Sequence, residues 1–557
     1  MRKMRNIKHI SQLAAFIMLL MLTSCGKDFL EIDYYDIVDP DVMMQTEDGI
    51  NKGLIGCYDA LYGIKGVGDK DWYFKPHIQL ADMPALDCQA GGWDANFSRF
   101  AWKADDAFFI IPWKQSYIAI DRVNRFLDKL KDVDPKIFEG GQTTKDQIEA
   151  EARTIRAYNY YYLAINFGRL PMLETGETYG NTPAKPRAES MDEVWDFIIN
   201  DFEYAIEKLD WKPRNNQGGR VTKGMAKAYV AKVYMYKKDW EKAKKHLQDI
   251  VNSGEYQLEP VFGAIHSESY RWGKESVWEV AHPDFENMFW GANNTYDAVW
   301  WPVWNMKWGS LFISHEWIHS FEPGDRRLRY SAFTYKEKNP YTGQVAPFDR
   351  GKPYAQGGSV PNNYCLKFWK RKQGSNKKVF YSMSAILMRY AEVLLNLSEC
   401  KFETGEDGWG EINQIRNRAW GNLEVGVTTE ELPEQYPDSI PRLPNTVSVP
   451  DAQAYYTQYK AAKGYTSPVW KVALIQERRH EFNSEYSLYY DLTRMGVAKE
   501  YLDIEYPVGG RTDLPPELGL GTNRQVQYDD HFSLFPIPYD EIITNEGISQ
   551  DDQNPGY

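Results

Sequence analysis

Hydrophobic residues recur with helical spacing over several long stretches of the chain. The first stretch covers about Asp105 to Lys131, and the residues that keep the spacing are Ile118, Val123, Phe126, Leu127 and Leu130. The second covers about Thr144 to Phe167, where Gly168 and Pro171 end the pattern because neither residue continues a helix readily. Both stretches predict long helices that bury one face.

Three further stretches extend this helical pattern. One covers about Ser190 to Leu209 and starts with Ser190 and Glu193 at the spacing of a capping box. The other two, Lys223 to Tyr256 and Leu387 to Trp420, each resemble a tetratricopeptide repeat, with helix, short turn and helix. In the first copy the residues at packing positions of the repeat are Tyr234, Trp240, Ala243, Leu247 and Ile250. A single helix pair cannot bury its own apolar face, so the pairs should stack. The alternative is a set of unrelated antiparallel helices.

Long segments rich in Gly, Pro, Asn and Asp lie between and after these helices. They span about residues 67–103, 281–309, 335–361, 421–468 and 508–530. Loops of this length in a compact domain are usually functional or disordered, and their Trp and Tyr content argues against disorder. The sequence therefore predicts a mainly α-helical scaffold of tetratricopeptide-like helix pairs, with few short strands and long inserted loops. The repeat helices fall within about 105–256 and 381–420.

The N-terminal residues have the pattern of an export signal. A basic start is followed by the apolar run ISQLAAFIMLLML, which is typical of a secretory signal and short for a membrane span. The segment LTSC, Leu22 to Cys25, resembles the bacterial lipobox, in which cleavage precedes a cysteine that receives lipid. We expect residues 1–24 to be the signal peptide, and acyl chains on Cys25 to anchor one domain, residues 25–557, to a membrane. The alternative is an ordinary signal peptide with a chance cysteine.

Composition narrows the function classes. The net charge of −13 argues against nucleic acid as a partner, because phosphate binding needs a clustered basic surface. Aromatic residues make up 15% of the chain, with 19 Trp and 38 Tyr, which favours recognition by stacking as well as core packing. Disulfides are possible outside the cytoplasm, but the sequence does not give a pairing for the cysteines that lack C-x-x-C spacing, Cys57, Cys88, Cys365 and Cys400.

Several motifs, taken in order, resemble those of one family. SCGKDFLEIDYYD is similar to a lipidated cysteine followed by an acidic stretch, and Arg156 to Leu173 is similar to a helix that ends in a Phe-Gly-x-x-Pro turn. IQERRHEFNSEYSLYYDLTRMG is similar to a Glu-Arg helix, although SEYSLYYDL lacks the Gly and Arg that are common there. The most specific segment is the tail from Leu534 to Tyr557, LFPIPYDEIITNEGISQDDQNPGY. Together these motifs resemble the SusD/RagB family over nearly the whole chain.

The resemblance implies a function as well as a fold. Members of this family are surface lipoproteins of the outer membrane that capture nutrients, mostly glycans, for a SusC-like TonB-dependent transporter. The repeats face the transporter, and the ligand binds on a surface built from inserted loops, here about 67–103 and 281–309. The resemblance implies a binding protein with no catalytic activity and no cofactor. The alternatives are a secreted zinc-dependent hydrolase and an adaptor that binds only protein.

The segment from Phe289 to Gly309, FWGANNTYDAVWWPVWNMKWG, has the residue types that bind sugars. Sugar rings present C–H faces that lie flat on aromatic rings, while amide and carboxylate side chains bond the hydroxyls. The aromatic candidates are Trp290, Tyr296, Trp300, Trp301 and Trp304. The polar candidates are Asn293, Asn294 and Asp297. For each single Trp, the alternative is a place in the core.

A second cluster, GGWDANFSRFAW, falls where the family often places ligand aromatics. Its candidates for ligand binding are Trp93, Asn96 and Trp102.

The segment SHEWIHSFEPGD contains H-E-x-x-H, in which His315 and His319 could bind zinc and Glu316 could act as a general base. The segment lacks the Gly and His of the extended metzincin pattern. A simpler interpretation is an amphipathic helix that buries Ile313, Trp317 and Phe321, with the two histidines and Glu322 on its polar side. We favour the structural interpretation and expect no metal.

Overall fold

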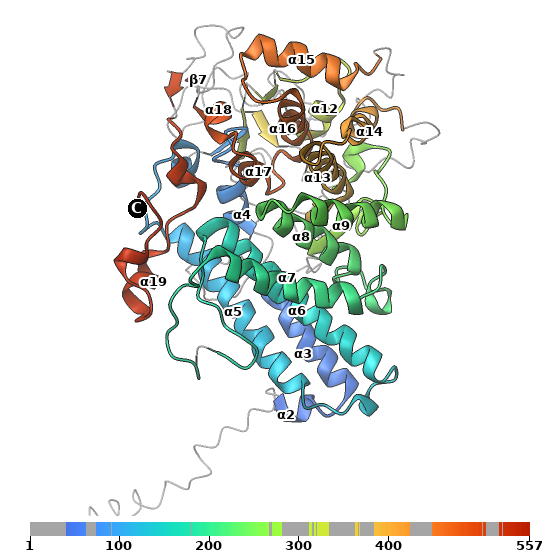
Figure 1. The fold of residues 1–557 in the computed structure, drawn as a ribbon, viewed down its shortest axis with the longest axis vertical. Helices are drawn as coiled ribbons and strands as arrows, with labels where there is room; N and C mark the ends of the chain where they lie inside the picture. Colours follow the sequence, from blue (N-terminus) through green and yellow to red (C-terminus); the bar gives the residue numbers. More distant parts are fainter. Residues whose placement is uncertain are drawn as a thin grey trace, which may run out of the picture.

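The computed structural model describes most of the chain after residue 39. The described residues are 40–62, 74–90, 92–178, 180–266, 270–280, 311–314, 317–318, 320–333, 363–365, 367, 384–423, 448–503, 505–507, 523–525 and 527–557. They are mainly helical, as the sequence predicts. Figure 1 shows the helices as stacked layers, with the N-terminal helices at one end and the α14–α16 region at the other.

The long helices pack in chain order, each against the next. They are α3 (Glu47–Asp59), α5 (Ala107–Leu130), α6 (Gln142–Phe167), α7 (Met191–Lys208), α8 (Lys223–Tyr236), α9 (Trp240–Ser253), α13 (Tyr390–Glu403), α14 (Trp409–Ala419), α15 (Ala452–Lys463) and α16 (Val469–Phe482). Helix α5 packs on α6, α6 on α7, α7 on α8 and α8 on α9, and α13 then joins α9 to α14 and α16. The stacked helix pairs predicted from the repeats are therefore confirmed.

Helix α6 lies at the centre of the N-terminal layers. Nearly every residue from Ala150 to Phe167 is buried, because α3, α5 and α7 cover it. The helix ends at Gly168, whose φ of 76° lies in the left-handed region that favours glycine. A Cβ at this position would lie 3.0 Å from Leu534 of the C-terminal tail. The predicted end of this helix is thus confirmed. The lack of a side chain at Gly168 also leaves room for the C-terminal tail.

The caps of the helices follow the sequence signals. The Ser190 hydroxyl accepts a hydrogen bond from the Glu193 amide at 3.2 Å, which caps α7. The Glu193 carboxylate accepts from the Glu189 amide at 3.0 Å, so only half of the predicted capping box forms. In the first repeat, α9 begins after Asp239, and the left-handed Gly254 ends it. Three of the repeat's packing residues are fully buried between the helices, namely Ala243, Leu247 and Ile250.

Some segments differ from the sequence prediction. The second repeat begins with a strand, because Leu387 to Arg389 belong to β6 (Ala385–Arg389), and its first helix starts at Tyr390. The predicted loop regions 67–103 and 421–468 are partly helical, since they contain α4 (Phe74–Ala81) and α15. Short helices complete the described chain, namely α2 (Pro40–Met43), α12 (Arg327–Ser331), α17 (Leu488–Arg494), α18 (Ala498–Leu502) and α19 (Tyr539–Thr544).

The strands are short and form three small antiparallel sheets. Four strands, in the order β1-β3-β5-β4, make the largest sheet, namely β1 (Cys88–Ala90), β3 (Leu311–Ile313), β5 (Asn363–Cys365) and β4 (Ala332–Phe333). The other two sheets pair β2 (Ser276–Val280) with β6, and β7 (Glu505–Pro507) with β8 (Asn523–Gln525). The four described cysteines, Cys57, Cys88, Cys365 and Cys400, are buried and free.

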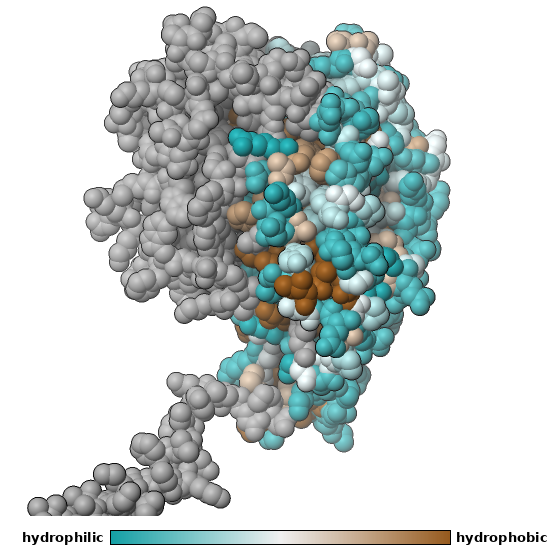
Figure 2. Space-filling view, turned by 90° about the vertical axis from the view of Figure 1, so that its left-hand side faces the viewer, coloured by the Kyte–Doolittle hydropathy of each residue, from teal (hydrophilic) through white to brown (hydrophobic). Residues whose placement is uncertain are grey.

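The surface of the described chain is mostly polar. Figure 2 shows mainly hydrophilic residues on the coloured part of the face that it draws, with a hydrophobic patch at mid-height at the edge of the grey region. One main hydrophobic core runs through the described residues from α3 to the tail. Among the helices that the structure describes, none is both long enough and apolar enough to cross a membrane.

Candidate ligand-binding site

The structure describes only part of the predicted ligand site. Trp290, Asn293, Asn294, Tyr296, Asp297, Trp300, Trp301 and Trp304 all lie outside the described residues, as does Cys25. In the second cluster, Trp93 lies in a short 3-10 helix, η3 (Gly92–Arg99), and Asn96 in the same helix is half-buried. The position of the site is therefore inferred from the described elements that flank these segments.

Trp102 is a core residue, so the prediction that it binds ligand is wrong. Its side chain is only 5% exposed and packs among Phe97, Phe532 and Phe535. Its indole N–H donates a hydrogen bond to the Tyr557 hydroxyl at 2.8 Å. Because neighbouring aromatic rings cover the Trp102 ring and its N–H already binds Tyr557, no face of the ring is open to a sugar.

The pairing of β1 with β3 joins the two strands that adjoin the predicted aromatic clusters in the sequence. The strands are antiparallel, and Ala90, the last residue of β1, pairs with Leu311, the first residue of β3. The chain leaves β1 directly into η3 and enters β3 directly from the Trp-rich segment 289–309. Paired residues in an antiparallel sheet lie about 5 Å apart. The two clusters are far apart in sequence but start from the same end of one strand pair.

Several described residues in and around the H-E-x-x-H segment are buried, although Phe321 is only half-buried. Ile313 belongs to strand β3, so it does not share a helix with Trp317, although both side chains are buried. The Trp317 indole donates to the Arg479 carbonyl at 2.8 Å, which fixes the segment to α16. Glu322 is also buried and accepts hydrogen bonds from Arg416, so its predicted place on a polar face is wrong.

The three residues of the zinc hypothesis, His315, Glu316 and His319, lie outside the described residues. Within the described parts of the chain, no group of three His, Cys, Asp or Glu side chains is arranged to hold a metal ion.

Helix α16 supports the strand pair that carries the clusters. The Arg479 guanidinium donates to both carboxylate oxygens of Asp87, the residue before β1, at 2.6 to 3.1 Å. The Asp87 carbonyl in turn accepts from the Ser314 amide, just after β3, at 2.9 Å. Both partners of the ion pair are buried, where a bidentate Arg–carboxylate pair is strong and directional. One arginine of α16 thus holds both strands.

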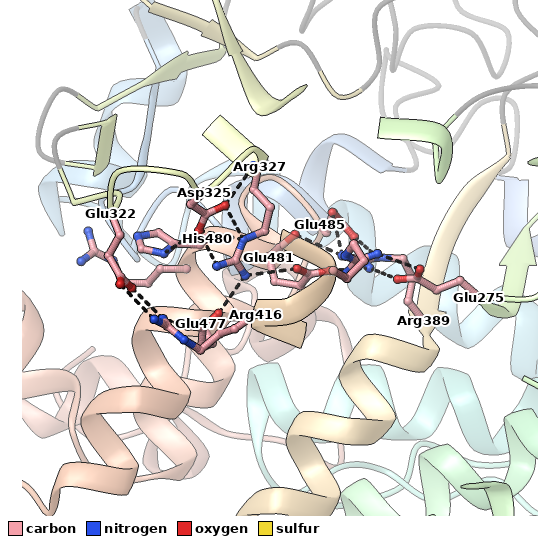
Figure 3. A network of polar contacts seen from close by, with 12 residues as sticks. Glu275, Glu322, Asp325, Arg327, Arg389, Arg416, Glu477, His480, Glu481 and Glu485 are labelled. Carbon is pink, nitrogen blue, oxygen red and sulfur yellow. Dashed lines mark hydrogen bonds and ion pairs between the residues drawn. The ribbon is translucent and has the colours of Figure 1, made fainter. Parts of the chain in front are cut away.

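A buried ion cluster lies beside this support (Figure 3). We call it the central ion cluster, and its members are Glu275, Lys367, Arg389, Arg418, Glu481 and Glu485. Arg389 donates to Glu275 at 2.5 Å, to Glu481 at 2.9 Å and to Glu485 at 2.6 Å. Arg418 donates to Glu275 at 2.9 Å and also to Glu481. The cluster joins β6 and α14 to the end of α16.

The charges of the central ion cluster hold one another in the ionised form. Burial alone raises the pKa of the Glu481 carboxyl, but Arg418, Arg389 and Arg327 lower it to about 2. Burial likewise raises the pKa of Glu485, and Arg389 and Lys367 bring it well below its usual range. The cluster is therefore a salt-bridged support, and both carboxyls remain ionised at neutral pH.

A second ion cluster continues along the same face of α16 and is joined to the first through Arg327, which also pairs with Glu481. Its members are Glu322, Asp325, Arg327, Arg416 and Glu477. Burial lowers the pKa of the neighbouring His480 well below its usual value, and Arg327 lowers it further, so the imidazole is neutral. His480 instead shares a hydrogen bond with the Ser320 hydroxyl at 2.8 Å and stacks on Phe321.

The sequence analysis missed these clusters, although one signal for them was present. The run QERRHEF in α16 has charged residues on every face of the helix, which excludes an ordinary amphipathic helix. A helix of this kind is buried only if each charge has a partner. The partners come from distant segments, so the sequence could indicate that they exist but not which residues they are.

Comparison with known proteins agrees with this architecture. A family model described as "SusD family" matches residues 188–557, which is more than half of the chain. The chain belongs to the SusD family. A second model, described as "Starch-binding associating with outer membrane", matches residues 28–235. The resemblance that the sequence motifs carry is thereby confirmed.

Relatives of this SusD family member match it over nearly its whole length. The chain is 23% identical over 563 residues to "SusD-like protein P2" of Formosa agariphila, covering 97% of this chain and 98% of the relative. A SusD-like protein of Bacteroides fragilis has a TM-score of 0.67 at 19% identity, covering 93% of this chain and 99% of that chain. Surface glycan-binding protein A of Bacteroides thetaiotaomicron, solved with laminarihexaose, has a TM-score of 0.65 at 19% identity, covering 91% and 99%. These structures show a shared fold.

Proposed function

We propose that the chain is a cell-surface lipoprotein of the outer membrane that binds glycans and has no catalytic activity. It is anchored through lipid on Cys25, captures an oligosaccharide and delivers it to a SusC-like TonB-dependent transporter. The observation that carries the proposal is the Ala90–Leu311 pair, from which both predicted aromatic clusters start. Membership of the SusD family and the fold shared with a protein solved with laminarihexaose support it.

The physical basis of binding is aromatic stacking combined with hydrogen bonds. The Trp-rich segment 289–309 supplies stacking surfaces such as Trp300, together with the amides of Asn293 and Asn294. Trp93 and Asn96 supply the same chemistry from η3, which follows β1. Sites on loops carried by a rigid scaffold are common, because the scaffold fixes the direction in which each loop leaves. Here the scaffold is the strand pair that Arg479 holds.

The test uses the chain from residue 26 onward, purified without its lipid anchor. Isothermal titration calorimetry against laminarihexaose and a panel of other oligosaccharides should identify at least one that binds. The Trp300→Ala and Trp93→Ala variants should then weaken that binding at least about tenfold, which corresponds to ~1.4 kcal/mol. The matched control is Tyr539→Ala, because Tyr539 is an exposed aromatic residue on α19, outside both clusters.

The same measurements separate the proposal from its alternatives. Unchanged affinity in both Trp variants would reject the site. A lack of binding across glycans and peptides, combined with capture by the transporter alone, would favour a protein-only adaptor. Stoichiometric zinc together with hydrolysis that a chelator abolishes would instead establish the hydrolase.

A further inference from the structure

A separate cleft lies at the start of the first repeat, and its walls come from two segments. One wall is the segment between α7 and α8, including Trp211 and Arg220, and the other is the turn before β2, including Trp272 and Lys274. The cleft encloses about 200 Å³, room for one sugar ring. All the residues named here are described, and none belongs to the predicted aromatic clusters.

Aromatic side chains line this cleft. Trp272 stands at its mouth and is 45% exposed, which is unusual for so large an apolar side chain. Trp211 and Tyr256 are half-buried in its walls. Trp278 is buried in the lining, and its indole N–H has no hydrogen-bond partner among the described residues. The cleft thus offers apolar ring surface to a ligand.

Trp272 is held in this exposed position by the surrounding backbone. Its φ of 53° lies in the left-handed region, where a bulky residue is rare and often marks a functional site. The Trp272 amide donates to the buried Glu279 carboxylate at 2.9 Å. The amide of Lys274, two residues later in the same turn, donates to the Glu259 carboxylate at 3.0 Å. Two buried carboxylates therefore fix the turn before any ligand binds.

The opposite wall is fixed as well. Glu151 of α6 is completely buried and accepts from Arg214 at 2.6 Å and from Arg220 at 2.8 Å. Gly218 of this wall lies against the Trp272 ring, because a Cβ there would be 2.3 Å from a ring carbon. Both walls are thus attached to the core, and the glycine lets them approach each other. A preformed cleft loses little conformational entropy when it binds a ligand.

The charges around the cleft favour an anion. Lys212 on one wall and Lys274 on the other are exposed, whereas the acidic lining residues are the half-buried Glu255 and the buried Glu279, which already accepts from the Trp272 amide. Arg271 adds a third positive charge beside the mouth, because its guanidinium lies 4.4 Å from the centre of the Trp272 ring. Thr222, the N-cap of α8, also lines the cleft, so the positive end of that helix dipole lies close by. This local excess contrasts with a chain of net charge −13.

We propose that the cleft between Trp272 and Lys212 is a second saccharide site, which takes one sugar ring bearing a carboxylate or a sulfate ester. The aromatic lining contacts the ring, and Lys212 and Lys274 bind the anionic group. The site is independent of the glycan site proposed on the loops.

The test is calorimetric titration of the chain from residue 26 with three probes. Trigalacturonic acid carries carboxylates, a sulfated carrageenan tetrasaccharide carries sulfates, and laminarihexaose is neutral. We expect at least one acidic probe to bind, and the double variant Lys212→Ala/Lys274→Ala to weaken it at least about tenfold. The matched control, Lys52→Ala/Lys136→Ala, removes the same charge from exposed positions elsewhere and should leave the affinity within about twofold.

Two further variants test the aromatic part. Trp272→Ala should also weaken the acidic probe about tenfold, and Gly218→Leu should abolish its binding by filling the mouth. Both changes lie at the surface, so circular dichroism should show an unchanged fold. The proposal is overturned if neither acidic probe binds, if the lysine variant binds like its control, or if the probe's affinity depends on Trp300 and not on Trp272. Loss of laminarihexaose binding in Trp300→Ala alone would leave the two sites distinct.

Discussion

At the scale of single residues, Glu481 is a fully buried charge that depends on several partners. It accepts hydrogen bonds from Arg389, Arg418 and Arg327. A charge in such a place is tolerated only while its partners remain, because removing one partner leaves the others buried and unpaired. The residue therefore affects stability far more than its single charge suggests.

We expect Glu481→Gln to reduce the free energy of unfolding by about 3–5 kcal/mol at pH 7, because it removes one of the carboxylates that balance the charge of three buried arginines. The pKa of Glu481 is lowered from 4.5 to about 2, so its contribution is complete above pH 4.5 and is lost as the pH falls toward 2. The variant should therefore lose less stability than the parent over this range. Urea unfolding from pH 7 down to pH 3 measures both effects.

The control for this experiment is an exposed ion pair. Lys52 and Asp48 lie 2.7 Å apart with side chains 66% and 78% exposed, so Lys52→Met should change the free energy by less than about 1 kcal/mol. A Glu481→Gln variant no less stable than this control would show that the central ion cluster adds nothing to stability.

At the scale of elements, the feature that determines the proposed glycan site is the attachment of β1 and β3 to α16. Strands of three residues have few ladder hydrogen bonds and are marginal by themselves. Their position depends on Asp87, Ser314 and Arg479, which join the two strands to one helix. A substitution in α16 should therefore affect the proposed ligand-binding loops even where the substituted residue does not contact a ligand.

We expect Arg479→Met to loosen both strands, because it removes the bidentate guanidinium partner of the buried Asp87 carboxylate. Amide hydrogen exchange at residues 88–90 and 311–313 should become faster by at least about tenfold, while exchange in α8 stays unchanged. Affinity for the oligosaccharide identified with the parent chain should fall as well. Unchanged exchange in both strands would contradict the role given to Arg479. A control is Lys471→Met, on the same helix but half-buried and distant from the strands.

At the scale of the whole molecule, the C-terminal tail joins parts of the chain that are far apart in sequence. The Asn554 amide donates to the Phe167 carbonyl at 3.0 Å and to the Phe535 carbonyl at 2.7 Å. The Tyr557 hydroxyl donates to the Leu534 carbonyl and accepts from Trp102. These hydrogen bonds attach the C-terminal tail both to the end of α6 and to the loop around Trp102.

Removal of residues 554–557 should lower the free energy of unfolding by about 3–5 kcal/mol, since several partly buried hydrogen bonds of ~1 kcal/mol each are lost. Tyr557→Phe removes only the hydroxyl and should cost about 1 kcal/mol. Thermal and urea unfolding of the two variants give these values. Equal stability of the truncated and the parent chains would show that the tail is not part of the core.

The sequence by itself determined most of the long helices, the helix pairs of the repeats and the family, but not α4, α15 or the strand that begins the second repeat. Helical periodicity, the N-cap of α7 and Gly168 are local signals. Such signals can be read from the sequence without knowing which distant residues pack against them. The two aromatic clusters were also visible as composition, because sugar-binding residue types were concentrated in two segments.

Only the tertiary structure decided which residues act together. Trp102 and Trp93 look alike in sequence, and the tail made Trp102 a core residue. The charged run of α16 indicated that partners exist but did not identify them, and they come from β6, α14 and the segment before β1. The cleft at Trp272 joins two segments about 50 residues apart, neither of which has a motif. The physical reason is the same in each case: burial, ion pairing and cleft shape depend on contacts distant in sequence, which periodicity does not encode.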